Sequence, residues 1–212
     1  MALTKVIGNG LGTLGDGTTN DTKIVFNGNA QDYHIGLDDS ADSLVIGKGS
    51  ALGTTTSMSF DENGIVTQPL QSAFNAILTN HFTISSLNTY NNLVFGTERF
   101  DQNGDYNTSD GVFTAPVTGR YLLTTSLYLF NSLDSAASYY YLNLETSNET
   151  VDVYFTTNTF LNSDTNGFNL QASVVTDMSA SDTARVRIYQ AGGSAQTQIA
   201  SGHSHFSGAL IC

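Results

Sequence analysis

Two histidines near the end of the chain have a spacing that suits metal binding. His203 and His205 are two positions apart in the segment HSHF. Side chains two residues apart on a β-strand lie on the same face, and neutral imidazole is a common ligand of divalent transition metals. We therefore predict that both imidazoles face the same way. The alternative is a solvent-exposed or stacked pair that binds no metal.

A run of three tyrosines forms the second candidate site. In the segment SYYYLNLE, strand alternation sends every second side chain, beginning with Tyr140, to the core. The opposite face then carries Tyr139, Tyr141 and Asn143. Exposed phenol rings beside an amide suit the recognition of a sugar or a protein. Under the alternative interpretation, a neighbouring subunit covers this face.

The remaining reactive side chains form no complete catalytic pattern, so no catalytic residue is predicted. The single cysteine is Cys212, and the chain has no Gly-x-Ser-x-Gly motif. Asp38, Asp39 and Asp42 have a spacing that suits calcium, although a solvated acidic turn is the more common outcome. Paired carboxylates that cleave a polysaccharide, contributed by different chains, are a further alternative. No cofactor is expected apart from the transition metal.

Composition and charge narrow the class of protein. The 212 residues are 40% hydrophobic and 12% charged, and the formal net charge is -12. So acidic a chain repels nucleic acid and anionic lipid. No run of about 18 apolar residues is present to span a bilayer, and the first residues do not resemble a secretory signal. We expect a folded protein that is made in a cytoplasm, binds no nucleic acid and does not insert into a membrane.

Short runs of β-branched and aromatic residues, separated by Gly, Asn and Asp, predict an all-β fold. The runs before Pro69 are brief, and those after it are longer and numerous enough for a jelly-roll sandwich. Because proline interrupts a strand ladder, we place a boundary there. The prediction is a small β-rich module over residues 1–69 and a larger sandwich over residues 70–212. The segment LQSAFNAIL fits a helix and a strand equally well.

Four segments of the larger domain carry a resemblance to a known family. They are FNA (74–76), VFGTERFDQNGDYN (94–107), GVFTAPVTGRY (111–121) and FSGALI (206–211). Together they resemble the globular head of complement component one-q, a tumour-necrosis-factor-like jelly roll. The resemblance implies a strand for SAFNAIL and a homotrimer. One departure is that the family's Gly-Asp before the penultimate strand is Ser181-Asp182 here.

The segment GVFTAPVTGRY is best explained as a turn between strands. Pro116 presets the backbone for a turn, and Gly119 is expected to take a positive φ after it. Phe113 and Tyr121 would pack on either side as the chain reverses. We therefore expect this stretch to be structural and not a ligand site.

The module before Pro69 resembles short β-rich modules of bacteriophage tail fibres and other virion proteins. The resemblance implies attachment to other virion proteins, with assembly in the host cytoplasm. Three chains would bury the apolar faces of these short strands together. The predicted protein is therefore a trimeric, non-enzymatic virion protein, such as a tail fibre or its tip, whose head binds a glycan or protein on the host surface.

Two alternatives remain for this protein. One is a capsid fibre or decoration protein without a receptor role, and the other is an enzyme that degrades an envelope polysaccharide.

In a trimer, the resemblance places the closing strand near the contact between subunits. Six imidazoles from three copies of His203 and His205 would then hold one divalent transition metal on the trimer axis.

Overall fold

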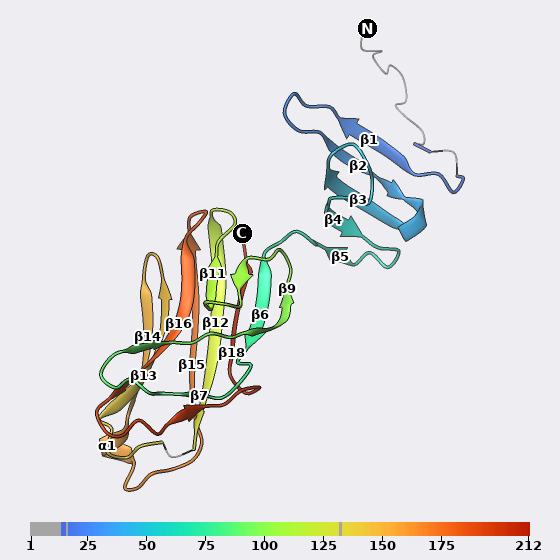
Figure 1. Ribbon diagram of the computed structural model, residues 1–212. Helices are drawn as coiled ribbons and strands as arrows, with labels where there is room; N and C mark the ends of the chain where they lie inside the picture. Colours follow the sequence, from blue (N-terminus) through green and yellow to red (C-terminus); the bar gives the residue numbers. More distant parts are fainter. Residues whose placement is uncertain (1–13, 16, 132) are drawn as a thin grey trace. The chain divides into compact units, whose positions relative to one another are not determined.

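The computed structural model describes residues 14, 15, 17–131 and 133–212, so residues 1–13 of the predicted N-terminal module lie outside the described part (Figure 1). The chain divides into two compact units, residues 1–70 and 71–212. Each unit is described by itself. No helix among the described residues is long and apolar enough to cross a membrane.

The first unit is a five-stranded antiparallel sheet in which each strand pairs with the next along the chain. Its elements are β1 (Thr22–Phe26), β2 (Tyr33–Asp38), the 3-10 turn η1 (Asp39–Ala41), β3 (Ser43–Lys48), β4 (Thr56–Phe60) and β5 (Val66–Thr67). The turn between β2 and β3 ends at Asp42, whose φ of 47° lies in the left-handed region.

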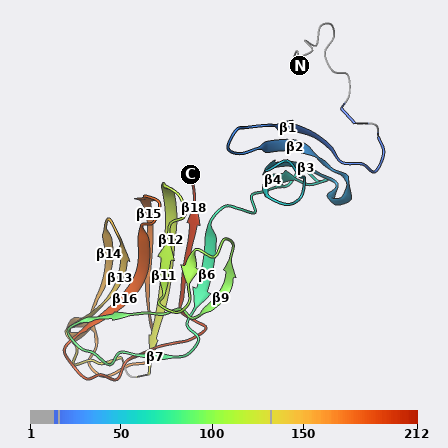
Figure 2. The ribbon, with the colours of Figure 1, turned by 45° about the horizontal axis from the view of Figure 1, so that its top comes forward.

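The second unit is a sandwich of two antiparallel sheets. One, the β12 sheet, has the order β7-β17-β12-β18-β6-β9, with β15 also paired to β12. Its strands are β6 (Ala73–Ile77), β7 (Phe82–Thr83), β9 (Thr97–Asp101), β12 (Gly119–Phe130), β15 (Phe168–Met178), β17 (Gln198–Ile199) and β18 (His205–Leu210). Figures 1 and 2 show β12 side by side with β18 along most of the length of β18.

The other sheet, the β16 sheet, has the order β10-β11-β16-β13-β14, with β8 also paired to β16. Its strands are β8 (Tyr90–Asn92), β10 (Tyr106–Asn107), β11 (Val112–Thr114), β13 (Tyr139–Thr146), β14 (Thr150–Thr156) and β16 (Thr183–Ala191). The one α-helix among the described residues, α1 (Thr157–Phe160), follows β14. The predicted all-β class is therefore confirmed, and SAFNAIL forms strand β6 as the resemblance implied.

The core between the two sheets is centred on Phe74 of β6. Its ring centroid lies 4.9 Å from those of Tyr106 and Phe113, both on the β16 sheet. It lies 5.0 Å from the ring of Phe206, on β18 of its own sheet. Tyr121 extends the cluster, with its ring 5.6 Å from Phe113. Aromatic contacts of this kind add to the free energy gained by burying the rings, so the cluster joins the two sheets.

The segment GVFTAPVTGRY carries the chain from the β16 sheet to the β12 sheet. The hydroxyl of Tyr121 donates a hydrogen bond to the carbonyl of Val117, 2.8 Å away, and so fastens the turn to the core. The expected positive φ at Gly119 is wrong, because this glycine is not among the residues with positive φ. A Cβ there would instead lie 2.6 Å from the carbonyl oxygen of Cys212. Glycine is needed for this close approach of two backbones.

The residue that replaces the family's glycine before the penultimate strand is held in an unfavourable conformation. Ser181 has a φ of 76°, in the turn between β15 and β16. Its backbone N–H donates to the carbonyl of Ala115, 2.8 Å away, which fixes this conformation. An L-residue other than glycine is strained there.

We predict that Ser181→Gly raises the free energy of unfolding by about 1 kcal/mol, because glycine accepts a positive φ without strain. Urea denaturation at fixed protein concentration measures the change. The matched control is Ser179→Gly in the same turn, where the φ is not positive and glycine should destabilise. An equal effect of the two substitutions would contradict the strain at position 181.

Candidate functional site

A row of four tyrosines crosses the outer face of the β16 sheet. Tyr154 on β14 pairs in register with Tyr141 on β13, Tyr141 pairs with Tyr189 on β16, and Tyr189 pairs with Tyr90 on β8. Side chains directly opposite each other on neighbouring strands lie close enough to interact. The sheet therefore brings together tyrosines from four separate segments of the chain.

The rings of this row contact one another. The centroid of Tyr141 lies 4.8 Å from those of Tyr154 and Tyr189, and the planes of Tyr141 and Tyr189 differ by 12°. Tyr90 meets both Tyr141 and Tyr189 edge to face at 5.6 Å. Tyr139 adds a fifth ring, stacked 5.9 Å from Tyr141. We call these five side chains, Tyr90, Tyr139, Tyr141, Tyr154 and Tyr189, the tyrosine cluster.

A polar row lies beside the tyrosine cluster and holds it in place. Asn143 donates a hydrogen bond from Nδ2 to Asp152, and its Oδ1 accepts one from Nε of Arg187 at 2.9 Å. The guanidinium of Arg187 lies 4.0 Å from the centre of the Tyr90 ring, and its Nη2 contacts Oε1 of Glu145 at 2.8 Å. The charges of Arg187 and Glu145 are paired, whereas Asp152 is bound to a neutral amide, so an acidic side chain borders the cluster.

The structure corrects the predicted exposure of this face. Tyr140 is fully buried in the core as expected, but Tyr141 is only 8% exposed and Asn143 only 1%. Both are covered by neighbouring strands of the same chain. The accessible rings are instead those at the two ends of the row, Tyr90 at 41% and Tyr154 at 61%.

Two tyrosines of the cluster, Tyr141 and Tyr154, have raised pKa values. Burial raises the pKa of Tyr141, and the neighbouring Tyr90, Tyr154 and Asp152 raise it further. Burial also raises the pKa of Tyr154, and Asp152 adds to this. The cluster therefore offers ring surface and phenol hydroxyls, which suit a ligand that carries both apolar and hydroxyl groups.

Sequence analysis missed Tyr90, Tyr154 and Tyr189. Alternation along TVDVYFT and ARVRIYQ does place Tyr154 and Tyr189 on the outer face, because the residues on either side of them point into the core. The signal that was missing was the register between strands that are far apart in the chain.

The two candidate histidines do not share a strand. His205 is the first residue of β18, but His203 lies in the preceding turn, so the expected alternation is wrong for His203. The imidazole of His203 is exposed and meets the ring of Tyr128 edge to face at 5.7 Å. His205 is half-buried on the outer face of the β12 sheet. Strand geometry therefore gives no reason for the two rings to converge on one metal.

Of the acidic residues of the first unit, Asp38 and Asp21 accept hydrogen bonds from the segment Asp39–Ala41. The hydroxyl of Ser40 donates to Asp38 at 2.7 Å, and the backbone N–H of Asp39 donates to Asp21 at 3.1 Å. Within residues 14–15, 17–131 and 133–212, no group of three or more His, Cys, Asp or Glu side chains is placed to hold a metal ion.

The outer face of the β12 sheet is mostly uncharged. Its two central cross-strand rows are Val175, Leu122, Ala209 and Ala73, and Ser173, Thr124, Ser207 and Asn75. Small side chains and hydroxyls predominate, and the hydroxyls of Thr124 and Ser207 lie 2.8 Å apart. We call these eight side chains the uncharged face. In a chain with a formal net charge of -12, such a face suits close contact with another molecule.

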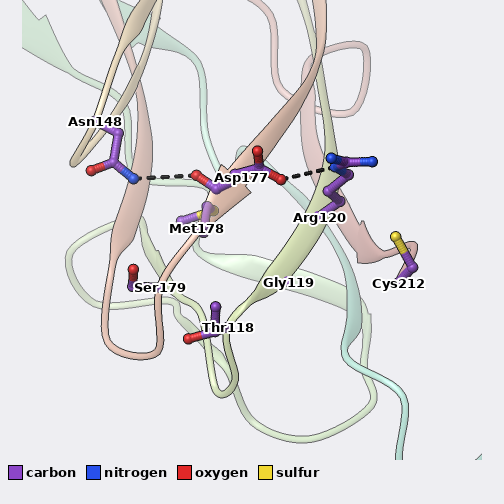
Figure 3. A pocket seen from close by; sticks show the side chains of 8 residues that line it. All are labelled: Thr118, Gly119, Arg120, Asn148, Asp177, Met178, Ser179 and Cys212. Carbon is purple, nitrogen blue, oxygen red and sulfur yellow. Dashed lines mark hydrogen bonds and ion pairs between the residues drawn. The ribbon is translucent and has the colours of Figure 1, made fainter.

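One end of the uncharged face opens on a hollow of about 380 Å³ (Figure 3). There Nε of Arg120 contacts Oδ1 of Asp177 at 2.9 Å, and Nδ2 of Asn148 donates to the backbone carbonyl of Asp177 at 3.2 Å. The Arg120 and Asp177 side chains are 62% and 80% exposed. An ion pair so exposed contributes little to stability, and the hollow contains no buried reactive group among the residues described.

Comparison with known proteins agrees with this fold. The model of the C1q domain family matches residues 73–211, and the chain therefore belongs to the C1q domain family. Among solved structures, it is similar to the globular domain of zebrafish complement 1qA, with 19% identity over 67% of this chain and 98% of that one and a TM-score of 0.50. Two crystal structures of murine APRIL, at pH 8.0 and 8.5, match with 11% identity over 66% of this chain and 99% of theirs, at TM-scores of 0.46 and 0.44. No curated protein matches the chain in sequence.

Family membership confirms the jelly-roll fold that the sequence predicted for this region. Domains of the C1q and tumour-necrosis-factor-like class are typically non-enzymatic binding or structural domains, and they commonly form homotrimers.

We predict that His205 makes stability depend on pH. Burial lowers the pKa of His205 below its usual 6.5, and the positive charge of Arg99 lowers it further. As the pH falls through about 6.5, the unfolded chain takes up a proton that the folded chain does not, so the free energy of unfolding decreases. His205→Gln should lose less stability than the wild type between pH 7.5 and 5.5, measured by urea denaturation at one protein concentration. Equal losses would contradict the prediction.

Proposed function

We propose that this chain is a non-enzymatic, homotrimeric virion protein of a bacteriophage, a tail fibre or fibre tip whose C1q domain binds a ligand on the host surface. The observation that carries the proposal is the uncharged face of the β12 sheet. Three strongly acidic chains associate most readily where their contact surfaces lack unpaired carboxylates. The alternation of small, hydroxyl and aliphatic side chains on that face meets this requirement.

Substitution of Ser207 tests the trimer. Ser207 is half-buried in the centre of the uncharged face, so Ser207→Glu would place an unpaired carboxylate in each contact, at a cost of about 3 kcal/mol each. Sedimentation equilibrium should show a trimer for the wild type and a monomer for the variant at micromolar concentration. Thr156→Glu, on an exposed position of edge strand β14, is the control and should remain trimeric. A monomeric wild type would overturn the trimer.

The tyrosine cluster supports the host-binding part of the proposal. It lies on the sheet opposite the uncharged face, so trimer contacts through the β12 sheet leave it accessible. Its open rings and phenol hydroxyls match the chemistry of a saccharide, which presents C–H groups on one side and hydroxyls on the other. Three copies on one trimer would turn weak single sites into strong attachment.

We predict that Tyr154→Ala weakens binding of the full-length protein to host cells by about tenfold, because a stacking ring of this size is worth about 1 kcal/mol or more. Binding is measured by titrating fluorescently labelled protein onto cells. Phe160→Ala is the matched control, since Phe160 is an equally large exposed ring, 71% accessible, on α1. Equal losses of binding for both variants would assign the effect to non-specific hydrophobic contact and not to the tyrosine cluster.

Labelling of particles tests the virion role. Gold-labelled antibody against the protein should mark the tail or its tip in negative-stain images of particles from a culture that produces it. Label over the capsid would instead identify a capsid fibre or decoration protein, and absence of label from particles would overturn the virion role. Release of fragments from host polysaccharide incubated with the pure protein would identify an enzyme.

A further inference from the structure

The first unit contains almost no core of its own. Among its described residues, Val45 is the one hydrophobic side chain that is fully buried. All other buried hydrophobic residues of the described chain belong to the second unit. A sheet of this size needs a buried apolar face to be stable, so the unit lacks the interaction that would keep it folded alone.

The large hydrophobic side chains of this unit lie instead on an exposed face of the sheet. One register row joins Ile24 of β1, Ile35 of β2, Ile46 of β3 and Met58 of β4. The adjacent row continues with Leu37, Leu44, Phe60 and Val66. We call these eight side chains the apolar face. Within it, Ile24 is 44% exposed, Leu37 47% and Leu44 42%.

The opposite face of the same sheet has no room for large apolar side chains around Gly36 and Gly47, because neighbouring atoms lie too close to these glycines. Gly36 and Gly47 lie on that face, and a Cβ on Gly36 would lie 2.5 Å from the carbonyl oxygen of Thr22. A Cβ on Gly47 would lie 2.7 Å from the ring of His34. His34 itself is 1% exposed and its Nδ1 lies 2.9 Å from the carbonyl of Gly49. Apart from Val25 and Val45, the hydrophobic residues of these strands therefore lie on the side of the sheet that carries the apolar face, where Phe26 and Tyr33 form the next row.

We propose that the apolar face is covered by the same face of two further copies of this chain, so that three first units share one core. This inference rests on the proposed homotrimer but concerns a contact separate from that of the C1q domain. Leu14 of the same chain borders the apolar face beside Ile24 and Leu37, but it is itself 49% exposed and does not cover the face. Another copy of the chain is a partner supplied in equal amount with it.

Two features of the chain favour this occupant. None of the eight side chains of the apolar face is charged, and the next row on the same side of the sheet holds Phe26, Tyr33 and Lys48. Bringing three copies of an acidic chain together there therefore buries no carboxylate. A trimer of C1q domains would also hold three first units at a high effective concentration, which favours their association over capture of an unrelated protein. Strand rows of matched Ile and Leu side chains are suited to pack against identical rows around a threefold axis.

The proposal is tested by thiol accessibility in the full-length protein. Cys212, exposed in the second unit, is first replaced by Ser. Ile24→Cys then places a thiol on the apolar face, and the adjacent Lys23→Cys places one on the opposite, exposed side of the same strand. Leu44→Cys on β3 is a second probe in case one variant folds poorly. We expect the thiols at positions 24 and 44 to react with maleimide at least about tenfold more slowly than the thiol at position 23.

Cross-linking distinguishes coverage by other copies from coverage by the same chain. During an incubation long enough for the slowly reacting thiols to be modified, a short bis-maleimide should join chains of the Ile24→Cys variant into covalent dimers, whereas Lys23→Cys should give few. Sedimentation equilibrium of the same samples reports the trimer independently. Thiols that react freely in a trimeric protein would overturn the shared core while leaving the trimer intact. Thiols that are protected in a protein of monomer mass would show that the chain covers its own face, and would also overturn the proposal.

Discussion

The stacking of Phe74 between rings of the opposite sheet is the contact on which the C1q domain depends. Phe74 is fully buried and reaches Tyr106 and Phe113 across the sandwich. Room for it is made by Gly208 on the neighbouring strand, where a Cβ would lie 2.7 Å from the Phe74 ring. Removal of so well packed a ring typically costs about 3–5 kcal/mol. Aromatic contacts between the two sheets therefore stabilise this domain. The side chains on its two outer faces are not needed for the fold and can differ in chemistry.

The two outer faces of the sandwich use this freedom in different ways. The β12 sheet presents small and hydroxyl side chains that suit contact between identical chains, and the β16 sheet presents aromatic rings that are supported by Arg187 and Asn143. The first unit shows the reverse situation. There the better-covered face holds glycines and His34, and the large apolar residues lie outside. One unit supplies its own core, and the other lacks one.

Alternation along SYYYLNLE was sufficient to predict which of its residues point into the core. It placed Tyr140 inside and Tyr139 on the outer side, and the family resemblance identified β6 correctly. It failed where the outcome depends on distant partners. The burial of Tyr141 comes from strands whose register no single segment encodes, and Gly119 is required by the backbone of Cys212, far along the chain. His203 was misplaced because strand β18 begins two residues later, at His205.

The pairing of β6 with β18 has a consequence for how such a protein can change. These are the first and last strands of the C1q domain, and they run antiparallel with Ala73 opposite Ala209. The backbone N–H of Leu210 donates to the carbonyl of Ser72 at 2.9 Å, so the chain enters and leaves the domain at one point. A domain with adjacent ends can be cut out, exchanged or inserted into a loop of another protein without stretching the host chain. The geometry therefore makes this domain a transferable cassette, which recombination between genes can move as a single piece.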